Sequence, residues 1–209
     1  MKTLRVNIIS TADIDWAAQE RAPIDVYKWG GSFQPEAWGQ AVYVKTGDER
    51  EGLYAHLFCA ESKPRAIYHR HNEPVFKDSC LELFFTMNDC DKPGNGYINI
   101  ESNADPTTLI GYGGDRYTRT SIVDMGLEPF AVTSRKTDES WELFEFVPLA
   151  ALRQVFGVSE VDESTVFKGN FYKCGGDHQV LPYGSWAEIE SPTPDFHRPE
   201  FFGTFKLVR

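Results

Sequence analysis

The sequence predicts an all-β fold, an antiparallel two-sheet β-sandwich with one short helix. Apolar and polar residues alternate with a period of two along much of the chain. Turn signals rich in Gly, Pro and Asp separate these runs. A single segment has helical spacing, and one short helix cannot cover both faces of a parallel sheet. An antiparallel sandwich therefore agrees best with the pattern.

The alternation begins near the N-terminus, where Leu4, Val6 and Ile8 alternate with polar neighbours. A second clear run is Leu53 to Cys59. Similar runs bring the expected total to about ten strands: Cys80–Met87, Tyr97–Ser102, Leu109–Tyr112, Phe130–Arg135, Trp141–Val147, Val166–Cys174, Trp186–Ile189 and Gly203–Val208.

A hairpin and a helix are the most distinct local predictions. The five residues 136–140 connect two alternating runs, which predicts antiparallel neighbours. The helix follows: Pro148 suits a first helical position, Leu149, Leu152 and Phe156 share one face, and Gly157 can cap the end. No linker or repeat divides the chain, so residues 1–209 are interpreted as one domain, with 13–40 as a long connection packed by tryptophans.

Composition excludes several classes of function. A formal charge of -10 repels phosphate backbones and anionic lipid, so neither nucleic acid nor a membrane is an expected partner. The first ten residues lack the apolar core of a signal peptide, which predicts a cytoplasmic protein. The four cysteines are widely spaced and are interpreted as reduced thiols. The oligomeric state cannot be predicted.

The common enzyme motifs are absent, including the Gly-x-Ser-x-Gly elbow and the phosphate-binding glycine loops. Asp78 and Glu82 lie four residues apart on one expected strand, so a glycoside hydrolase that uses this carboxylate pair is an open alternative. Because close acid pairs also arise by chance in an acidic chain, no catalytic residue is assigned.

Two segments carry metal-ligand residue types. His69, His71 and Glu73 offer zinc ligands, although no third ordered ligand follows from the sequence. Residues 88–95 crowd oxygen donors into a turn, as a structural calcium site would, but Lys92 opposes a cation there. A metal site is therefore left undetermined; a structural calcium ion stays open, and no cofactor is expected.

Aromatic residues are numerous, with 5 Trp, 9 Tyr and 15 Phe. Some of these rings can lie on a binding surface, because sugar rings present apolar C–H faces that stack on aromatic planes. Sugar hydroxyls additionally need polar partners such as Asn, Glu, Arg or Lys.

Four segments together resemble the family 9 carbohydrate-binding modules, and more closely the family-9-like domains that are widespread in bacteria. In chain order they are Glu73–Phe84, Tyr97–Asn103, Gly169–Gly175 and Asp195–Gly203. The resemblance spans roughly residues 41–209. It implies a DOMON-like β-sandwich of immunoglobulin-like architecture and non-catalytic binding of a mono- or oligosaccharide.

The resemblance also implies a binding site. In well-known members two tryptophans clamp the reducing-end sugar, and these positions fall on Phe76 and Phe196, which have a smaller ring without an N–H donor. The polar positions fall on Glu82, Asn99 and Lys173, with Arg116 and Arg119 from the adjoining loop. Trp186 matches a core tryptophan. Typical members are secreted with glycanases and often bind calcium.

Two further alternatives stay open at this point. The domain can be a scaffold or interaction module that has lost sugar binding, given the two phenylalanines. Related DOMON-like sandwiches also include haem binders, for which Met87, Lys173 or a histidine would be the ligand.

Overall fold

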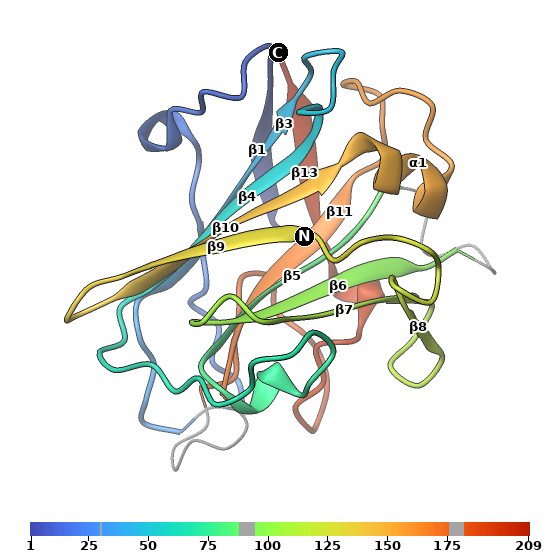
Figure 1. The fold of residues 1–209 in the computed structure, drawn as a ribbon. Coiled ribbons are helices and arrows are strands. Elements are labelled where there is room, and N and C mark those ends of the chain that lie inside the picture. Colours follow the sequence, from blue (N-terminus) through green and yellow to red (C-terminus); the bar gives the residue numbers. More distant parts are fainter. Residues whose placement is uncertain (30, 88–94, 176–181) are drawn as a thin grey trace.

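The computed structural model, which describes residues 1–29, 31–87, 95–175 and 182–209, confirms an all-β fold with one α-helix in these ranges. Its strands form one strongly curled sheet, as Figure 1 shows. Thirteen strands belong to it: β1 (Thr3–Ile9), β2 (Ala22–Pro23), β3 (Ala37–Val44), β4 (Gly52–Cys59), β5 (Cys80–Thr86), β6 (Tyr97–Asn103), β7 (Thr108–Gly113), β8 (Arg119–Ser121), β9 (Ala131–Lys136), β10 (Trp141–Pro148), β11 (Lys168–Cys174), β12 (Gly184–Ser185) and β13 (Gly203–Val208).

The sheet is mixed. Its main path runs β8-β7-β6-β5-β11-β13-β1-β3-β4-β10-β9, while β12 pairs with β11 and β2 with β3. The N-terminal strand β1 lies parallel to both β13 and β3. Long stretches of chain separate β1 from these partners, as parallel pairing requires. The prediction of a purely antiparallel sheet is therefore wrong at β1, and a division into two sheets is not confirmed because the described strands form one hydrogen-bonded path.

The main core lies inside the curl of the sheet. Inward-facing residues of distant strands, such as Val6, Leu57, Leu83 and Phe171, belong to one buried cluster. Trp186 joins this cluster, which confirms its predicted core position. Burial of this apolar surface is the main force that holds the curled sheet together.

A second cluster covers the opposite face of β5, β6 and β11. Here Phe84, Tyr97 and Tyr172 pack against Phe196 and Phe202 from the C-terminal segment. The short 3-10 turns η2 (Val75–Lys77) and η3 (Pro199–Phe201) belong to the segments on this side. The segment that carries η2 runs below β6 and β7 in the view of Figure 1. Because successive side chains of a strand point to opposite faces, β5, β6 and β11 contribute alternate residues to the two clusters.

The predicted hairpin and helix are confirmed. Strands β9 and β10 pair in antiparallel register from Lys136 and Trp141 onward. Helix α1 (Leu149–Phe156) buries its apolar face in the main core, and Gly157 ends it with a left-handed φ of 69°. Pro148 is the N-cap rather than the first helical residue. Within the described part of the chain, no helix has the length and hydropathy to span a membrane.

The predicted strand Trp186–Ile189 is absent, and the actual strand β12 ends at Ser185. The side chain of Asn170 explains this. Its Oδ1 accepts from the Ala187 N–H at 2.8 Å and its Nδ2 donates to the Ala187 carbonyl at 3.0 Å. These side-chain bonds satisfy the backbone groups that a strand would have used in its ladder.

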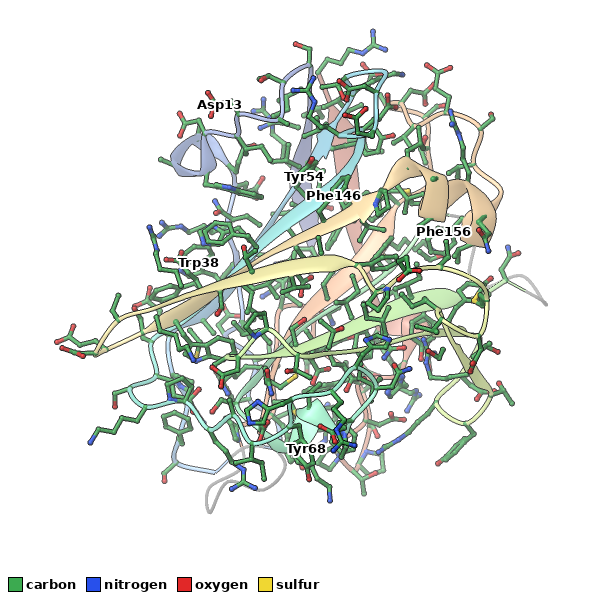
Figure 2. The ribbon with its side chains drawn as sticks, in the orientation of Figure 1. Asp13, Trp38, Tyr54, Tyr68, Phe146 and Phe156 are labelled. Atoms are coloured by element: carbon green, nitrogen blue, oxygen red, sulfur yellow. The ribbon has the colours of Figure 1, made fainter. Side chains whose placement is uncertain are left out.

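Strand β3, which is buried on both faces, was not predicted, because the segment up to residue 40 was interpreted as a long connection. On the outer side, Trp38 stacks on Phe58 of β4 with ring centroids 5.0 Å apart. On the inner side, Gly39 lies against the ring of Phe171, where a Cβ atom would come within 2.2 Å of that ring. Two more aromatic rings, Tyr54 of β4 and Phe146 of β10, contact each other on this outer side and are labelled in Figure 2. We call Trp38, Phe58, Tyr54 and Phe146 the outer aromatic row.

Candidate functional site

A cleft of about 440 Å³ lies over the second cluster, on the face of β5 and β6 that points away from the main core. Its volume falls within the roughly 300–1,000 Å³ that is typical of small-molecule sites. Six of the seven residues predicted to bind sugar line this cleft: Phe76, Glu82, Asn99, Arg116, Arg119 and Phe196. They come from five separate segments, so the fold rather than any single motif brings them together.

The floor of the cleft is formed by alternate residues of two adjacent strands. Glu82 of β5 lies directly opposite Glu101 of β6 in the antiparallel register. Their exposed fractions are 2% and 4%. Opposed side chains in such a pair have Cβ atoms about 4.5–5.5 Å apart. Two carboxyl groups therefore lie side by side at the base of the cleft.

Burial is the main cause of the raised pKa values of both carboxyl groups. It raises the pKa of Glu101 to about 7, against the lowering effects of the Asn99 hydrogen bond and of the Arg119 and Arg116 charges. Burial and the Glu101 charge raise the pKa of Glu82 well above its usual value, although the thiols of Cys174 and Cys80 lie within hydrogen-bonding reach. Because neighbouring like charges disfavour double ionisation, the pair retains a proton at neutral pH.

Asn99 connects the floor to the loop between β7 and β8. Its Nδ2 donates to Glu101 Oε1 at 2.9 Å, and its Oδ1 accepts from Arg119 Nε at 2.7 Å. The two terminal nitrogens of Arg119 donate to four backbone carbonyls, those of Gly113, Asp115, Tyr97 and Gly111. The guanidinium also lies over the Tyr97 ring, 4.4 Å from its centroid. Since all five of its N–H groups have protein acceptors, Arg119 orients Asn99 rather than offering a free donor.

His197 closes the floor from the C-terminal side. Its Nδ1 lies 2.9 Å from the Tyr97 hydroxyl, and its Nε2 lies 4.0 Å from Glu101 Oε1. Burial, followed by the nearby charges of Arg119 and Arg116, lowers the pKa of His197 to about 3. The imidazole is therefore neutral at physiological pH and serves as a hydrogen-bonding group without charge.

The two predicted aromatic positions differ in their surroundings. Phe76 in η2 is 37% exposed, whereas Phe196 is 8% exposed. Phe196 stacks on Tyr172 with centroids 4.3 Å apart and nearly parallel planes. Trp29 and Tyr183 also contact it. Phe196 is thus a rigid wall of the cleft, and Phe76 is an exposed ring at its edge.

Charged groups at the rim add to the site. Arg116, more than half exposed, lies 3.7 Å from the Asp195 carboxylate. Lys77 of η2 also lines the cleft. Sequence reasoning did not identify Glu101, His197, Asp195, Lys77 or Tyr183 as site residues. Glu101 could have been found, because it lies two residues after Asn99 on the same strand and so shares its face.

Lys173 does not line the cleft, contrary to its predicted role. It lies between Tyr172 and Cys174, which both belong to the cleft side, so its side chain points to the opposite face of β11. There it is fully buried and its Nζ lies 3.2 Å from Glu61 Oε2. The Trp141 ring centroid is 5.9 Å away. Lys173 is therefore part of the structural interior.

Asp78 is also outside the cleft. Its side chain is fully buried, and its Oδ2 accepts from the Ile67 and Tyr68 N–H groups and from Asn103 Nδ2. It holds the loop before β5 in place. Asp78 and Glu82 therefore do not face a common space, and the geometry does not support them as the acid and nucleophile of a glycosidase.

Two of the candidate zinc ligands, Glu73 and His71, make other contacts in the structure. The Glu73 carboxylate accepts from the backbone N–H groups of His69 and Arg70, and His71 Nδ1 contacts Thr108 Oγ1. Across the described ranges no group of three or more His, Cys, Asp or Glu side chains is arranged to hold a metal ion. Residues 88–94 of the predicted calcium loop lie outside the described residues. Met87, a candidate haem ligand, is buried in the main core.

Comparison with known proteins identifies relatives. Residues 12–207 match the family model described as carbohydrate-binding family 9. Among solved structures, a candidate carbohydrate-binding protein from Bacteroides uniformis is 28% identical, with 99% of each chain covered and a TM-score of 0.78. No curated protein matches the chain.

Two more distant structures share the fold. Both are of a family 9 carbohydrate-binding module from Caldicellulosiruptor kristjanssonii, one in complex with glucose and one with cellotriose. Each is 12% identical to this chain, covers 99% of it and has a TM-score of 0.63. The matched shares of those chains are 96% and 93%.

Proposed function

The chain belongs to carbohydrate-binding family 9, and we propose on that basis that it binds a mono- or oligosaccharide in the cleft between Phe76 and Phe196 without altering it chemically. The observation that carries the proposal is the convergence, on one cleft of about 440 Å³, of six residues that the family resemblance implies as the sugar site. The cleft combines aromatic walls with a polar floor, which is the combination that a sugar ring needs.

The aromatic residues supply the apolar part of the site. A sugar ring stacks its C–H face on a ring such as Phe196, which Tyr172 already holds in place. Because Phe196 is already packed against Tyr172 before binding, little conformational entropy is lost there. Phe76, which is 37% exposed, gains the larger burial when a sugar covers it. Two phenylalanines still provide less contact than two tryptophans, so we expect modest affinity.

The polar residues supply the hydroxyl partners. Glu82, Glu101 and Asn99 present their polar atoms at the floor, and His197 adds a neutral ring nitrogen. Arg116 and Lys77 line the cleft with cationic groups. Arg119 contributes indirectly, because its five N–H groups are committed to the protein and fix the direction of Asn99.

The ligands of the two Caldicellulosiruptor structures guide the choice of sugars to test. Those modules are solved with glucose and with cellotriose. Their shared fold with this chain supports gluco-configured mono- and oligosaccharides as the first ligands to examine. A scaffold module that has lost sugar binding is the competing interpretation, and the same experiment decides between the two.

Isothermal titration calorimetry with glucose, cellobiose and cellotriose tests the proposal. Each sugar is paired with its alditol, since loss of binding on reduction identifies a reducing-end site. We expect binding by the wild type and at least a tenfold loss in Phe76→Ala and Phe196→Ala, because each removes stacking area. Phe146→Ala is the matched control, since this half-buried ring lies on β10, away from the cleft.

Thermal unfolding of the same variants separates binding from stability. Phe76→Ala is expected to unfold at nearly the wild-type temperature, since its ring is more than a third exposed. A wild type that binds none of a broader panel of pentoses, hexoses and their oligomers would favour the scaffold interpretation. Sugar release from aryl glycosides would instead reveal a hydrolase.

A further inference from the structure

The pair of carboxyl groups at the floor of the cleft differs from the other acids of the site. Glu82 and Glu101 are cross-strand neighbours, almost fully buried, and both line the cleft. Asp195, the rim acid, is half-buried and lies 3.7 Å from Arg116. Glu101 is at hydrogen-bond distance only from the neutral Asn99 amide among its described side-chain partners, with His197 at 4.0 Å. The pair thus faces the ligand space without a buried cation between its members.

A sugar that enters the cleft changes the surroundings of this pair. It removes the remaining water above the two carboxyl groups, and removal of water disfavours their charged forms. A protonated carboxyl group donates one hydrogen bond and also accepts, whereas an ionised group only accepts. Adjacent sugar hydroxyls need both kinds of partner. A singly protonated pair therefore matches a sugar better than two carboxylates that repel each other.

We propose that Glu82 and Glu101 share one proton and that a bound sugar holds this proton on the pair, so that the cleft takes up a proton with its ligand, and loses affinity, in alkaline solution where the free pair ionises fully. This inference rests on the proposed sugar binding and adds its dependence on pH. By linkage, a ligand that binds the protonated form more tightly draws a proton onto the protein in the pH range where the free pair titrates.

Burial moves the pKa values of the thiols, phenols and imidazole that face the pair away from the neutral range. Burial raises the pKa of the Cys80 and Cys174 thiols well above their usual value. Burial likewise raises the pKa of the Tyr97 and Tyr172 hydroxyls. The pKa of His197 is lowered to about 3, chiefly by burial. Arginine stays protonated throughout. The remaining charged neighbours are Arg116 of the β7–β8 loop, Arg119 of β8, Lys77 of η2, Asp195, and Lys173 on the far face of β11.

The direct test is a calorimetric titration that measures both the heat of sugar binding and the number of protons taken up with the sugar. Calorimetric titration of one sugar, glucose, is repeated in buffers of different ionisation enthalpy at several pH values between about 5 and 9. We expect proton uptake of up to one per sugar bound, largest on the alkaline side of neutral, because the pKa of Glu82, raised well above its usual value by burial and the Glu101 charge, governs loss of the pair's last proton. Affinity should fall by up to about tenfold per pH unit on the alkaline side of this range.

Variants that remove one titrating carboxyl group test whether the proton binds to Glu82 and Glu101. Glu101→Gln keeps a hydrogen-bonding side chain of the same shape but cannot titrate, so we expect its proton uptake to vanish and its pH dependence to flatten. Glu82→Gln is a second variant with the same expectation. The control is Glu145→Gln, since Glu145 is a buried acid outside the cleft. Proton uptake on sugar binding should persist in that variant.

The outcomes distinguish this inference from the proposed function. Sugar binding whose affinity is constant with pH, without proton uptake by the wild type, would overturn the shared proton and leave the sugar site standing. Undiminished uptake in both Glu101→Gln and Glu82→Gln would likewise overturn it, because the proton would then reside elsewhere. Absence of sugar binding at every pH would overturn both the inference and the function on which it rests.

Discussion

Two pairs of buried ionisable residues lie on opposite faces of the same part of the sheet. They differ in whether the two members of the pair carry opposite charges. On the inner side Lys173 and Glu61 form an ion pair with a separation of 3.2 Å. On the cleft side Glu82 and Glu101 are both acids. The contrast suggests a division of roles, because a buried charge with its countercharge serves the fold, whereas a buried acid pair that lines a cleft is a candidate for contact with a ligand.

The ion pair of Lys173 and Glu61 is supported by further hydrogen bonds. Glu61 also accepts from Ser79 Oγ at 2.7 Å and from Trp141 Nε1 at 3.1 Å. Burial alone would raise the pKa of Glu61, but the Lys173 charge and these hydrogen bonds hold it below its usual value. Burial would lower the pKa of Lys173, but the neighbouring Cys59 and Glu61 raise it. Both directions indicate a charged pair.

The largest expected effect comes from breaking this inner pair. Glu61→Ala leaves the Lys173 ammonium buried without its countercharge, so the free energy of unfolding should fall by about 3–5 kcal/mol. Urea denaturation followed by tryptophan fluorescence measures the loss. The double variant Glu61→Leu with Lys173→Met should recover much of it, since neither charge then remains. A Lys173→Met protein that stays folded but loses sugar binding would contradict the assignment of Lys173 to the interior.

The second largest expected effect is a pH dependence of stability that arises from Glu145. This residue is a buried acid of the main core and forms no ion pair among the described residues. Ser102 Oγ donates to its Oε1 at 2.9 Å, while Oε2 has no hydrogen-bond partner. Burial raises the pKa of Glu145 from 4.5 to about 8. The folded state therefore binds an extra proton between these values, and stability should fall as pH rises through this range, by about 1.4 kcal/mol per pH unit at most.

Glu145→Gln removes this titration. Its free energy of unfolding should decline less between about pH 5 and pH 8 than that of the wild type, and the two proteins should differ most in alkaline solution. Denaturant titrations at several pH values measure both slopes. Glu200→Gln, at an exposed position next to Arg198, is the control and should follow the wild type. Parallel slopes in Glu145→Gln and wild type would show that Glu145 is not protonated in the fold.

The smallest effect concerns the positioning of Asn99 in the cleft. Arg119→Lys keeps the charge but loses the planar fork that binds Asn99 Oδ1 and four carbonyls. We expect sugar affinity to weaken by about three- to tenfold, or ~1 kcal/mol, because Asn99 becomes mobile. Calorimetry measures the change, with Arg50→Lys at an exposed pair with Asp48 as the control. A complete loss of binding would indicate that Arg119 contacts the sugar itself.

Strands with one buried and one more exposed face could be predicted from their alternation, and β13 is the clearest example, because Phe205 and Leu207 are buried while Lys206 between them is exposed. Strands β5 and β6 are buried on both faces and were still predicted. Strand β3 was missed because its first residues, which include Trp38 and Gly39, were interpreted as part of the long connection 13–40. The parallel position of β1 could not be foreseen either, because pairing between the two ends of the chain leaves no local signal.

The family motifs located the segments that form the site. Which of their residues line the cleft depends on the alternation of side chains between the two faces of each strand. In the antiparallel register Glu82 pairs with Tyr172 and not with Lys173. Side chains opposite each other share a face, so Lys173 must point away from Glu82. The same rule brings Glu101 to the cleft, two residues beyond Asn99. His197 and Asp195 belong to a loop whose path only the tertiary structure determines.

A crystal structure of the protein with a bound sugar, taken from the strongest ligand of the calorimetric panel, tests the central claim most directly. We predict a sugar ring between Phe76 and Phe196, with its hydroxyls in hydrogen-bond contact with Glu82, Glu101 or Asn99. A sugar bound only elsewhere, for example on the outer aromatic row, would contradict the assignment of the cleft as the carbohydrate site.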